Sequence, residues 1–147
     1  MHKSFCSRLT AAVLVLTFGI TAEAAAELPA APEGAFSIVV LPDTQGYVTD
    51  KTKHYFQSEV DWILDNRERQ NIVFVSHVGD IIDEYESDQQ WEIARRNMLR
   101  LSDKLPFGFS VGNHDMLSHG DSQKFQETFP ASLFEKQPWY GGQIKNN

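Results

Sequence analysis

The chain has 147 residues, of which 13 are lysine or arginine and 20 are aspartate or glutamate, and its formal net charge is −7 at pH 7. An acidic chain with no basic run is a poor candidate for nucleic-acid binding. Its length is enough for one small domain with a hydrophobic core, and its single cysteine excludes a framework of disulfides.

The amino-terminal residues are typical of a secretory signal peptide. Lys3 and Arg8 precede the apolar run Leu9–Ile20, and alanines spaced as A-x-A follow around Ala24. This run of about a dozen residues is shorter than the roughly 20 that span a membrane. An uncleaved anchor or a short core helix is the alternative interpretation.

Three segments follow from this pattern and from the composition after it: a signal peptide over residues 1–24, a linker rich in alanine and proline over 25–35, and a single domain over 36–147. Cleavage of the signal would remove the only cysteine, Cys6, and leave no membrane span. We therefore expect an exported protein, either periplasmic or extracellular.

Three short apolar runs predict strands, at Phe36–Leu41, Asn71–Val78 and Pro106–Val111. Continuous apolar runs of this length are typical of strands buried on both faces of a parallel sheet. Apolar residues at helical spacing predict helices over 52–70 and 87–105, and a shorter helical piece follows the last strand. This βαβαβ order predicts an α/β fold with a mostly parallel sheet.

A polar cluster follows each of the three apolar runs, in the stretches PDTQG, GDIID and GNHD. The polar side chains are Asp43 and Gln45 in the first, Asp80 and Asp83 in the second, and Asn113, His114 and Asp115 in the third. Because the carboxyl ends of parallel strands share one edge of the sheet, we expect the clusters to meet there. Oxygen ligands beside an imidazole favour a divalent metal site, and a carboxylate on a central strand can bridge two cations. A single cluster of this kind would be explained equally well by a turn or a helix cap.

In this order, D-x-(H), G-D-x-x-D and G-N-H-D resemble the motifs of the calcineurin-like metallophosphoesterases, here at residues 43–45, 79–83 and 112–115. The stretch LPDTQGY is similar to a bacterial, often exported, subgroup of that superfamily. The resemblance implies a partial metallophosphoesterase fold and hydrolysis of phosphomonoesters or phosphodiesters. It also implies two divalent metal ions, Mn, Mg, Fe or Zn, and a metal-bound hydroxide that attacks the phosphorus of a small phosphate ester.

The resemblance implies roles for the polar residues as well. Four are implied to be metal ligands: Asp43, Gln45, Asp80, which bridges the two ions, and Asn113. His114 is implied to stabilise the phosphoryl oxygens and to protonate the leaving alkoxide. Asp115 is implied to hold the ring of His114, whereas Asp83 is expected to shape its loop.

Two departures from the family pattern bear on function. Gln45 stands where the family has a histidine, and because an amide oxygen is a harder ligand than imidazole, we expect Mn²⁺ or Mg²⁺ to be favoured. The late G-H-x-H motif of the family is not in the chain, and His119 lies too near the third cluster to replace it. We therefore expect the N-terminal part of a domain whose second half is missing. A non-catalytic exported remnant or binding domain that retains the fold is the alternative function.

Other polar and aromatic residues are expected to be structural. His77 interrupts the second apolar run three residues before Asp80, and we expect a hydrogen-bonded core histidine or a residue behind the ligands there, with a direct ligand role as the alternative. Trp139 and Tyr140 are expected to pack a loop, because both side chains bury well at the edge of a domain, and lining a substrate cleft is the alternative.

Overall fold

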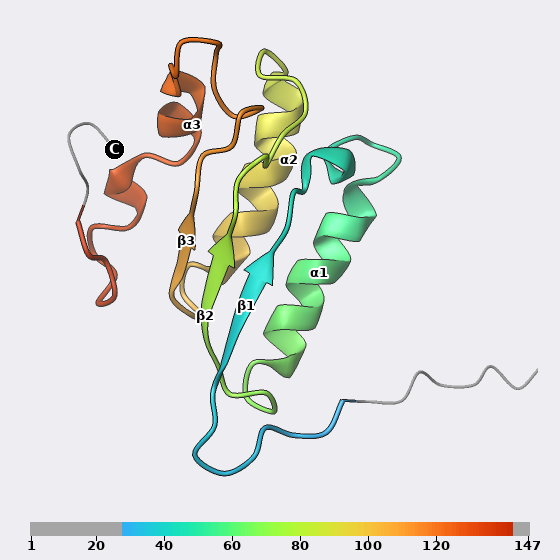
Figure 1. The fold of residues 1–147 in the computed structure, drawn as a ribbon, viewed down its shortest axis with the longest axis vertical. Coiled ribbons are helices and arrows are strands. Elements are labelled where there is room, and N and C mark those ends of the chain that lie inside the picture. Colours follow the sequence, from blue (N-terminus) through green and yellow to red (C-terminus); the bar gives the residue numbers. More distant parts are fainter. Residues whose placement is uncertain (1–27, 143–147) are drawn as a thin grey trace, which may run out of the picture.

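The computed structural model describes residues 28–142, so the signal peptide expected over residues 1–24 lies outside the described residues. The domain is built on a parallel sheet of three strands in the order β1-β2-β3 (Figure 1). The strands are β1 (Ser37–Leu41), β2 (Ile72–His77) and β3 (Phe107–Phe109). Each strand lies within one of the three apolar runs, so the expected α/β fold with a parallel sheet is confirmed.

Three α-helices accompany the strands in the described part of the chain: α1 (Lys53–Asn66), α2 (Asp88–Met98) and α3 (Gln123–Thr128). The 3₁₀ turns are η1 (Gln45–Tyr47), η2 (Leu99–Leu101) and η3 (Ala131–Leu133). Both long helices are shorter than their apolar patterns predicted. After α1 the chain turns toward β2 through Asn71, which has a left-handed φ of 45°, and α2 gives way to η2. Ser87 begins α2 as its cap, because its side chain accepts a hydrogen bond from the backbone N–H of Gln90.

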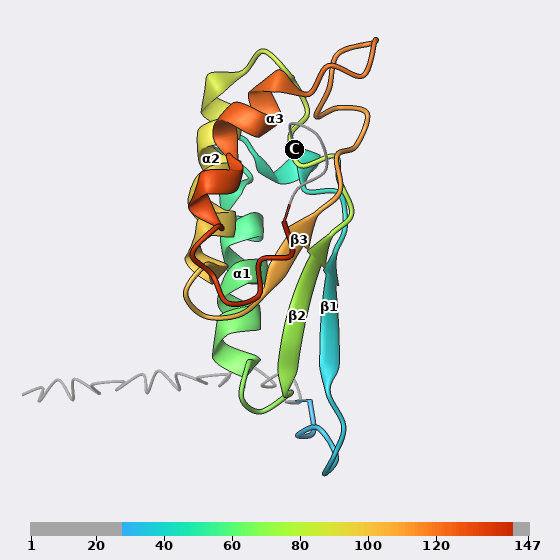
Figure 2. The same cartoon turned by 90° about the vertical axis from the view of Figure 1, so that its left-hand side faces the viewer.

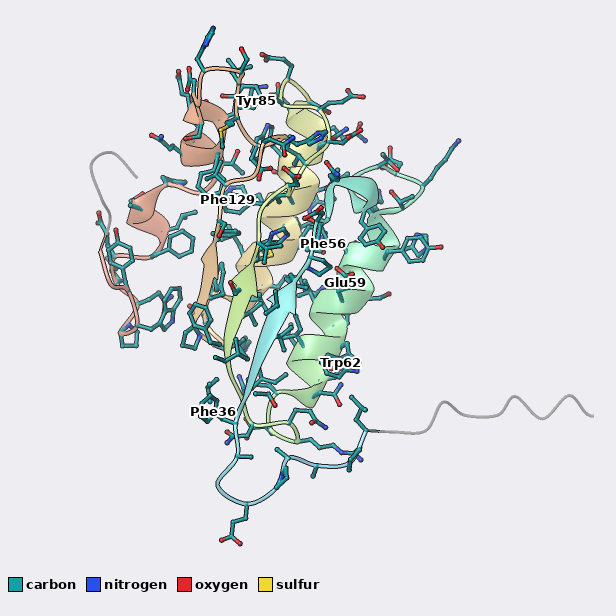
Figure 3. All side chains as sticks on the ribbon, viewed as in Figure 1. Phe36, Phe56, Glu59, Trp62, Tyr85 and Phe129 are labelled. Carbon is teal, nitrogen blue, oxygen red and sulfur yellow. The ribbon has the colours of Figure 1, made fainter. Side chains whose placement is uncertain are left out.

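Both long helices cover the same face of the sheet (Figure 2). Two right-handed crossovers that advance in the same direction along a sheet place their helices on one side of it. The core includes Phe56 and Ile63 from α1, Met98 from α2 and Val75 from β2, each at most 1% exposed. Figure 3 shows Phe56 between α1 and the strands.

The opposite face of the sheet differs from the expectation. Ile38 and Val40 of β1 are 55% and 58% exposed, and Phe36, just before this strand, is 64% exposed. The prediction of burial on both faces is therefore wrong for this outer face within residues 28–142. The physical reason is the topology, because both crossovers place their helices on the other side.

Part of the expected linker is bonded to the domain. The backbone N–H of Ala31 donates a hydrogen bond of 3.0 Å to the carbonyl of Arg69, and Nδ2 of Asn71 donates one of 2.6 Å to the carbonyl of Ala35. The segment before β1 is thus attached to the turn that follows α1. No helix within residues 28–142 has both the length and the apolar character needed to cross a membrane.

Val75→Thr and Val40→Thr make the same chemical change on the two faces of the sheet. Val75 is 0% exposed, so the new hydroxyl would be buried, and we expect the free energy of unfolding to fall by about 1–3 kcal/mol. At the exposed Val40 the change should stay within about 0.5 kcal/mol. Urea unfolding followed by circular dichroism measures both values, and equal losses would contradict burial on one face only.

Candidate metal centre

The loops that hold the three polar clusters leave the carboxyl ends of the strands on the same side of the molecule (Figure 1). The first loop follows β1, the second connects β2 to α2, and the third follows β3. Because parallel strands end at one edge of the sheet, three distant segments of the chain come together here.

Gly79 and Gly112 allow the second and third loops to touch. Gly79 has a φ of +103°, and a Cβ at this position would lie 2.6 Å from the backbone nitrogen of Gly112. A Cβ at Gly112 would lie 2.2 Å from Oδ1 of Asp80. Both distances are too short for a side chain, so the contact requires glycine on each loop.

Asp80 is the residue at which all three loops meet. Its Oδ1 accepts a hydrogen bond of 2.9 Å from the backbone N–H of His114, and its carbonyl accepts one of 3.0 Å from the backbone N–H of Gln45. Its φ of 48° lies in the left-handed region, which is uncommon for a residue other than glycine. Such a conformation persists where the surrounding structure holds it, and it occurs often at functional sites.

Asp115 joins the second and third loops from inside the protein. It is 0% exposed, and its Oδ1 accepts hydrogen bonds from the backbone N–H groups of Ile81 (2.8 Å) and Ile82 (3.2 Å). Its Oδ2 accepts one of 2.9 Å from the backbone N–H of Gly112. Burial raises the pKa of Asp115 above its ordinary value, and these three hydrogen bonds act in the opposite direction. We expected Asp115 to hold the ring of His114, and the structure differs because backbone N–H groups engage both carboxylate oxygens.

The ring of His114 is held by Asp83 instead. Its Nδ1 donates a hydrogen bond of 2.8 Å to the carbonyl oxygen of Asp83 and lies 3.5 Å from Oδ1 of the same residue. The bond to this carbonyl raises the pKa of His114, burial opposes it, and the neighbouring carboxylates add smaller increases. Because a carbonyl oxygen only accepts, Nδ1 carries the proton, and Nε2 is the ring nitrogen that can take up or release a second proton. In the sequence, only the GDxxD spacing pointed to Asp83. Its contact with His114 uses a backbone carbonyl, which every residue has, so residue type could not predict it.

The remaining candidates lie on the first and third loops. Asp43 and Asn113 are exposed, and each is next to a residue that is bonded to the second loop. Gln45 is partly buried, and its Oε1 is buried without a hydrogen-bond partner among the described residues. A buried carbonyl oxygen is unfavourable unless a donor or a cation completes its coordination.

The side-chain atoms in this region that could bind a metal ion are mostly oxygens, from both carboxylates and amides. Within residues 28–142, no three His, Cys, Asp or Glu side chains gather closely enough to hold a metal ion. The four candidate ligands contain two carboxylates, those of Asp43 and Asp80, and the amides of Gln45 and Asn113 supply the other oxygens. Carboxylate and amide oxygens together are a donor set that suits hard divalent cations.

His77 ties the first loop to the second from within the core. It is 0% exposed, and the backbone N–H of Gly79 donates a hydrogen bond of 3.2 Å to its Nδ1. Its Nε2 therefore carries the proton and donates a bond of 3.0 Å to Oγ1 of Thr44, which donates in turn to the carbonyl of Ile81. Burial lowers the pKa of His77 to about 4. With both ring nitrogens engaged, His77 is a hydrogen-bonded core histidine.

The fold and the three loops define a class of protein. The calcineurin-like phosphoesterase family matches residues 36–146, and this chain belongs to that family. The resemblance inferred from the three motifs is therefore confirmed. Phosphoesterases of this family generally use divalent metal ions.

One relative of the chain is the uncharacterized protein YvnB of Bacillus subtilis (strain 168), which is 37% identical over 123 residues. The match covers 82% of this chain and 9% of that protein, so the chain spans less than a tenth of the length of this relative. No solved structure matches the chain.

The buried His77 makes the stability of the domain depend on pH. Its pKa is about 4 in the folded protein and 6.5 ordinarily, so the unfolded state binds more protons between these values. Its contribution to the free energy of unfolding is complete above about pH 6.5 and falls by about 3 kcal/mol as the pH is lowered through about 4. His77→Gln should remove this part of the pH dependence in urea unfolding from about pH 4 to 7.5. An unchanged slope would contradict a neutral buried ring.

Proposed function

We propose that this chain carries the metal-binding loops of a phosphoesterase and hydrolyses phosphomonoesters or phosphodiesters of small molecules with two divalent ions. The observation that carries the proposal is the meeting of the three clusters at Asp80, which is bonded to the backbone of Gln45 and of His114. Membership of the calcineurin-like phosphoesterase family supports the class of reaction.

Four oxygen-bearing side chains are proposed as ligands: Asp43, Gln45, Asp80 and Asn113. The buried, unpartnered Oε1 of Gln45 supports this set, because a cation would complete an oxygen that no described residue satisfies. Asp80 follows the central strand of the sheet, so its carboxylate is proposed as the bridge between two ions. The preference of such oxygen donors for hard cations favours Mn²⁺ or Mg²⁺.

Divalent ions bound by these side chains would activate a water molecule as the nucleophile and polarise the phosphoryl oxygens. The chain itself contributes His114. When the ring is protonated on both nitrogens, Nδ1–H stays bonded to the carbonyl of Asp83, and Nε2–H can donate a hydrogen bond to a phosphoryl oxygen and its proton to the leaving alkoxide. Loss of that proton leaves the neutral ring with its proton on Nδ1. The bond from its backbone N–H to Asp80 keeps the imidazole beside the proposed bridging ligand. Asp115 is proposed to influence this chemistry indirectly, because it holds the second and third loops together.

The carboxylate of Asp80, the proposed bridging ligand, and the imidazole of His114 can be removed separately by substitution. Asp80→Asn replaces the proposed bridging charge with an amide, so hydrolysis of a chromogenic phosphate ester with Mn²⁺ should fall to the rate without added metal. His114→Ala removes the proposed acid and should lower kcat by about a hundredfold to ten-thousandfold. Steady-state rates at several substrate concentrations measure both effects.

The control for these variants is Asp65→Asn, the same change at an exposed position of α1, and it should keep the rate of the unmodified chain. Equal rates in the unmodified chain, Asp80→Asn and His114→Ala, with and without Mn²⁺, would contradict catalysis. That result would favour a non-catalytic domain that retains the fold.

Gln45 is expected to set the metal preference. Imidazole is a softer ligand than an amide oxygen, so Gln45→His should raise the ratio of the Zn²⁺ affinity to the Mn²⁺ affinity. Calorimetric titration of the purified chain with each metal alone measures this ratio. Gln57→His, at an exposed position of α1, is the matched control. Tight Zn²⁺ binding by the unmodified chain that Gln45→His leaves unchanged would remove Gln45 from the proposed ligands.

A further inference from the structure

Gln90, in the first turn of α2, holds the loop that follows the second polar cluster. It is 7% exposed, and its Oε1 accepts hydrogen bonds from the backbone N–H groups of Asp83 (2.8 Å) and Glu84 (2.9 Å). An amide oxygen can accept two hydrogen bonds, so this buried atom is fully satisfied. Removing it would leave two backbone donors without their acceptor, which is costly where water does not replace it.

One of these two donors belongs to the peptide unit that holds the proposed catalytic histidine. The nitrogen of Glu84 and the carbonyl of Asp83 lie in the same planar trans peptide, whose N–H and C=O point in opposite directions. The N–H is bonded to Gln90, and the C=O accepts the 2.8 Å bond from Nδ1 of His114. Because the peptide is rigid, holding its N–H also sets the direction of its carbonyl.

Gln90 is itself held in place by the start of the helix. Its backbone N–H donates a hydrogen bond of 3.1 Å to the carbonyl of Ser87, the cap residue. The next residue, Trp91, is 4% exposed and donates from Nε1 to the carbonyl of Tyr85 over 2.7 Å. Tyr85 lies at the end of the molecule toward which the strands point (Figure 3). Two successive residues of α2 therefore hold the loop over residues 83–85.

We propose that Gln90 is a positioning residue for His114. By holding the peptide between Asp83 and Glu84, it keeps Nδ1–H bonded to the carbonyl and the imidazole in one orientation, so that Nε2 is the nitrogen that takes up and releases the catalytic proton and the neutral ring is the Nδ1–H tautomer. The effect on catalysis rests on the function proposed above for His114. The effect on the tautomer does not, because it concerns the ring and the carbonyl alone.

The test compares three variants of the full chain at one position. Gln90→Met keeps the length of the side chain and removes the amide oxygen. Gln90→Asn keeps the amide and withdraws its oxygen by one carbon. Gln90→Glu keeps an acceptor oxygen at the same distance and should rescue. Gln89→Met is the matched control, because Gln89 is the exposed neighbour on α2 and donates to Asp50 instead.

Two measurements are made on each variant. The ¹⁵N chemical shifts of the imidazole nitrogens, recorded at a pH at which the ring is neutral, report the tautomer of His114. Steady-state hydrolysis of a chromogenic phosphate ester with Mn²⁺ reports kcat and KM separately. A purely structural role for Gln90 would lower the thermal midpoint without changing the tautomer, so the ring signal separates the two roles.

We expect the unmodified chain, Gln90→Glu and Gln89→Met to show the Nδ1–H tautomer. Gln90→Met and Gln90→Asn should show a mixture of tautomers, with kcat lowered about tenfold to a hundredfold and KM nearly unchanged. If Gln90→Met does not fold, Gln90→Asn decides the outcome. If the unmodified chain hydrolyses nothing, the function proposed above fails, and the tautomer still decides the role of Gln90. An Nε2–H tautomer in the unmodified chain, or an Nδ1–H tautomer retained in Gln90→Asn, would overturn the proposal.

Discussion

A buried carboxylate that is bonded to backbone N–H groups holds the second and third loops together. Asp115 accepts two of these bonds from the loop after β2 and one from Gly112 in its own loop. Taking a carboxylate out of water is unfavourable, and the hydrogen bonds offset that cost only when they form together. The position of Asp80 depends on this constraint, because Asp80 directly precedes the two isoleucines that Asp115 holds. An acid that looked catalytic in the sequence therefore forms a structural connection between two loops.

His77 connects the first loop to the second, as Asp115 connects the third loop to the second. Its hydrogen bond to Thr44, and that of Thr44 to Ile81, connect the first loop to the second from inside the core. The loop after the central strand is thus held from both sides, by an imidazole on one and a carboxylate on the other. Buried polar groups whose hydrogen bonds are satisfied specify one arrangement of the loops that they join. The exposed candidates Asp43 and Asn113 take their positions from these buried neighbours.

Residue type and spacing were enough to predict the strands, because continuous apolar runs of this length, bounded by glycine and polar residues, are typical of buried strands. They also predicted the edge at which the clusters meet, since parallel strands have one carboxyl end. The prediction failed at the outer face, where Ile38 and Val40 are exposed. Apolar character shows that a face can be buried, and the sense of the crossovers decides which face the helices cover. The length of α1 was overestimated because the chain leaves the helix after Asn66 and forms a turn over residues 67–71, a backbone event with weak sequence signal.

The order of elements, the parallel sheet, the residues of the candidate site and the resemblance to the phosphoesterase family were determined by the sequence alone. The tertiary structure decided which of those residues touch one another. It assigned the ring of His114 to the carbonyl of Asp83 and gave the carboxylate of Asp115 to backbone donors. It also brought Gln90 into contact with the peptide that holds the histidine. The physical reason is that these contacts run through backbone N–H and C=O groups, which every residue carries, so only the path of the folded chain selects among them.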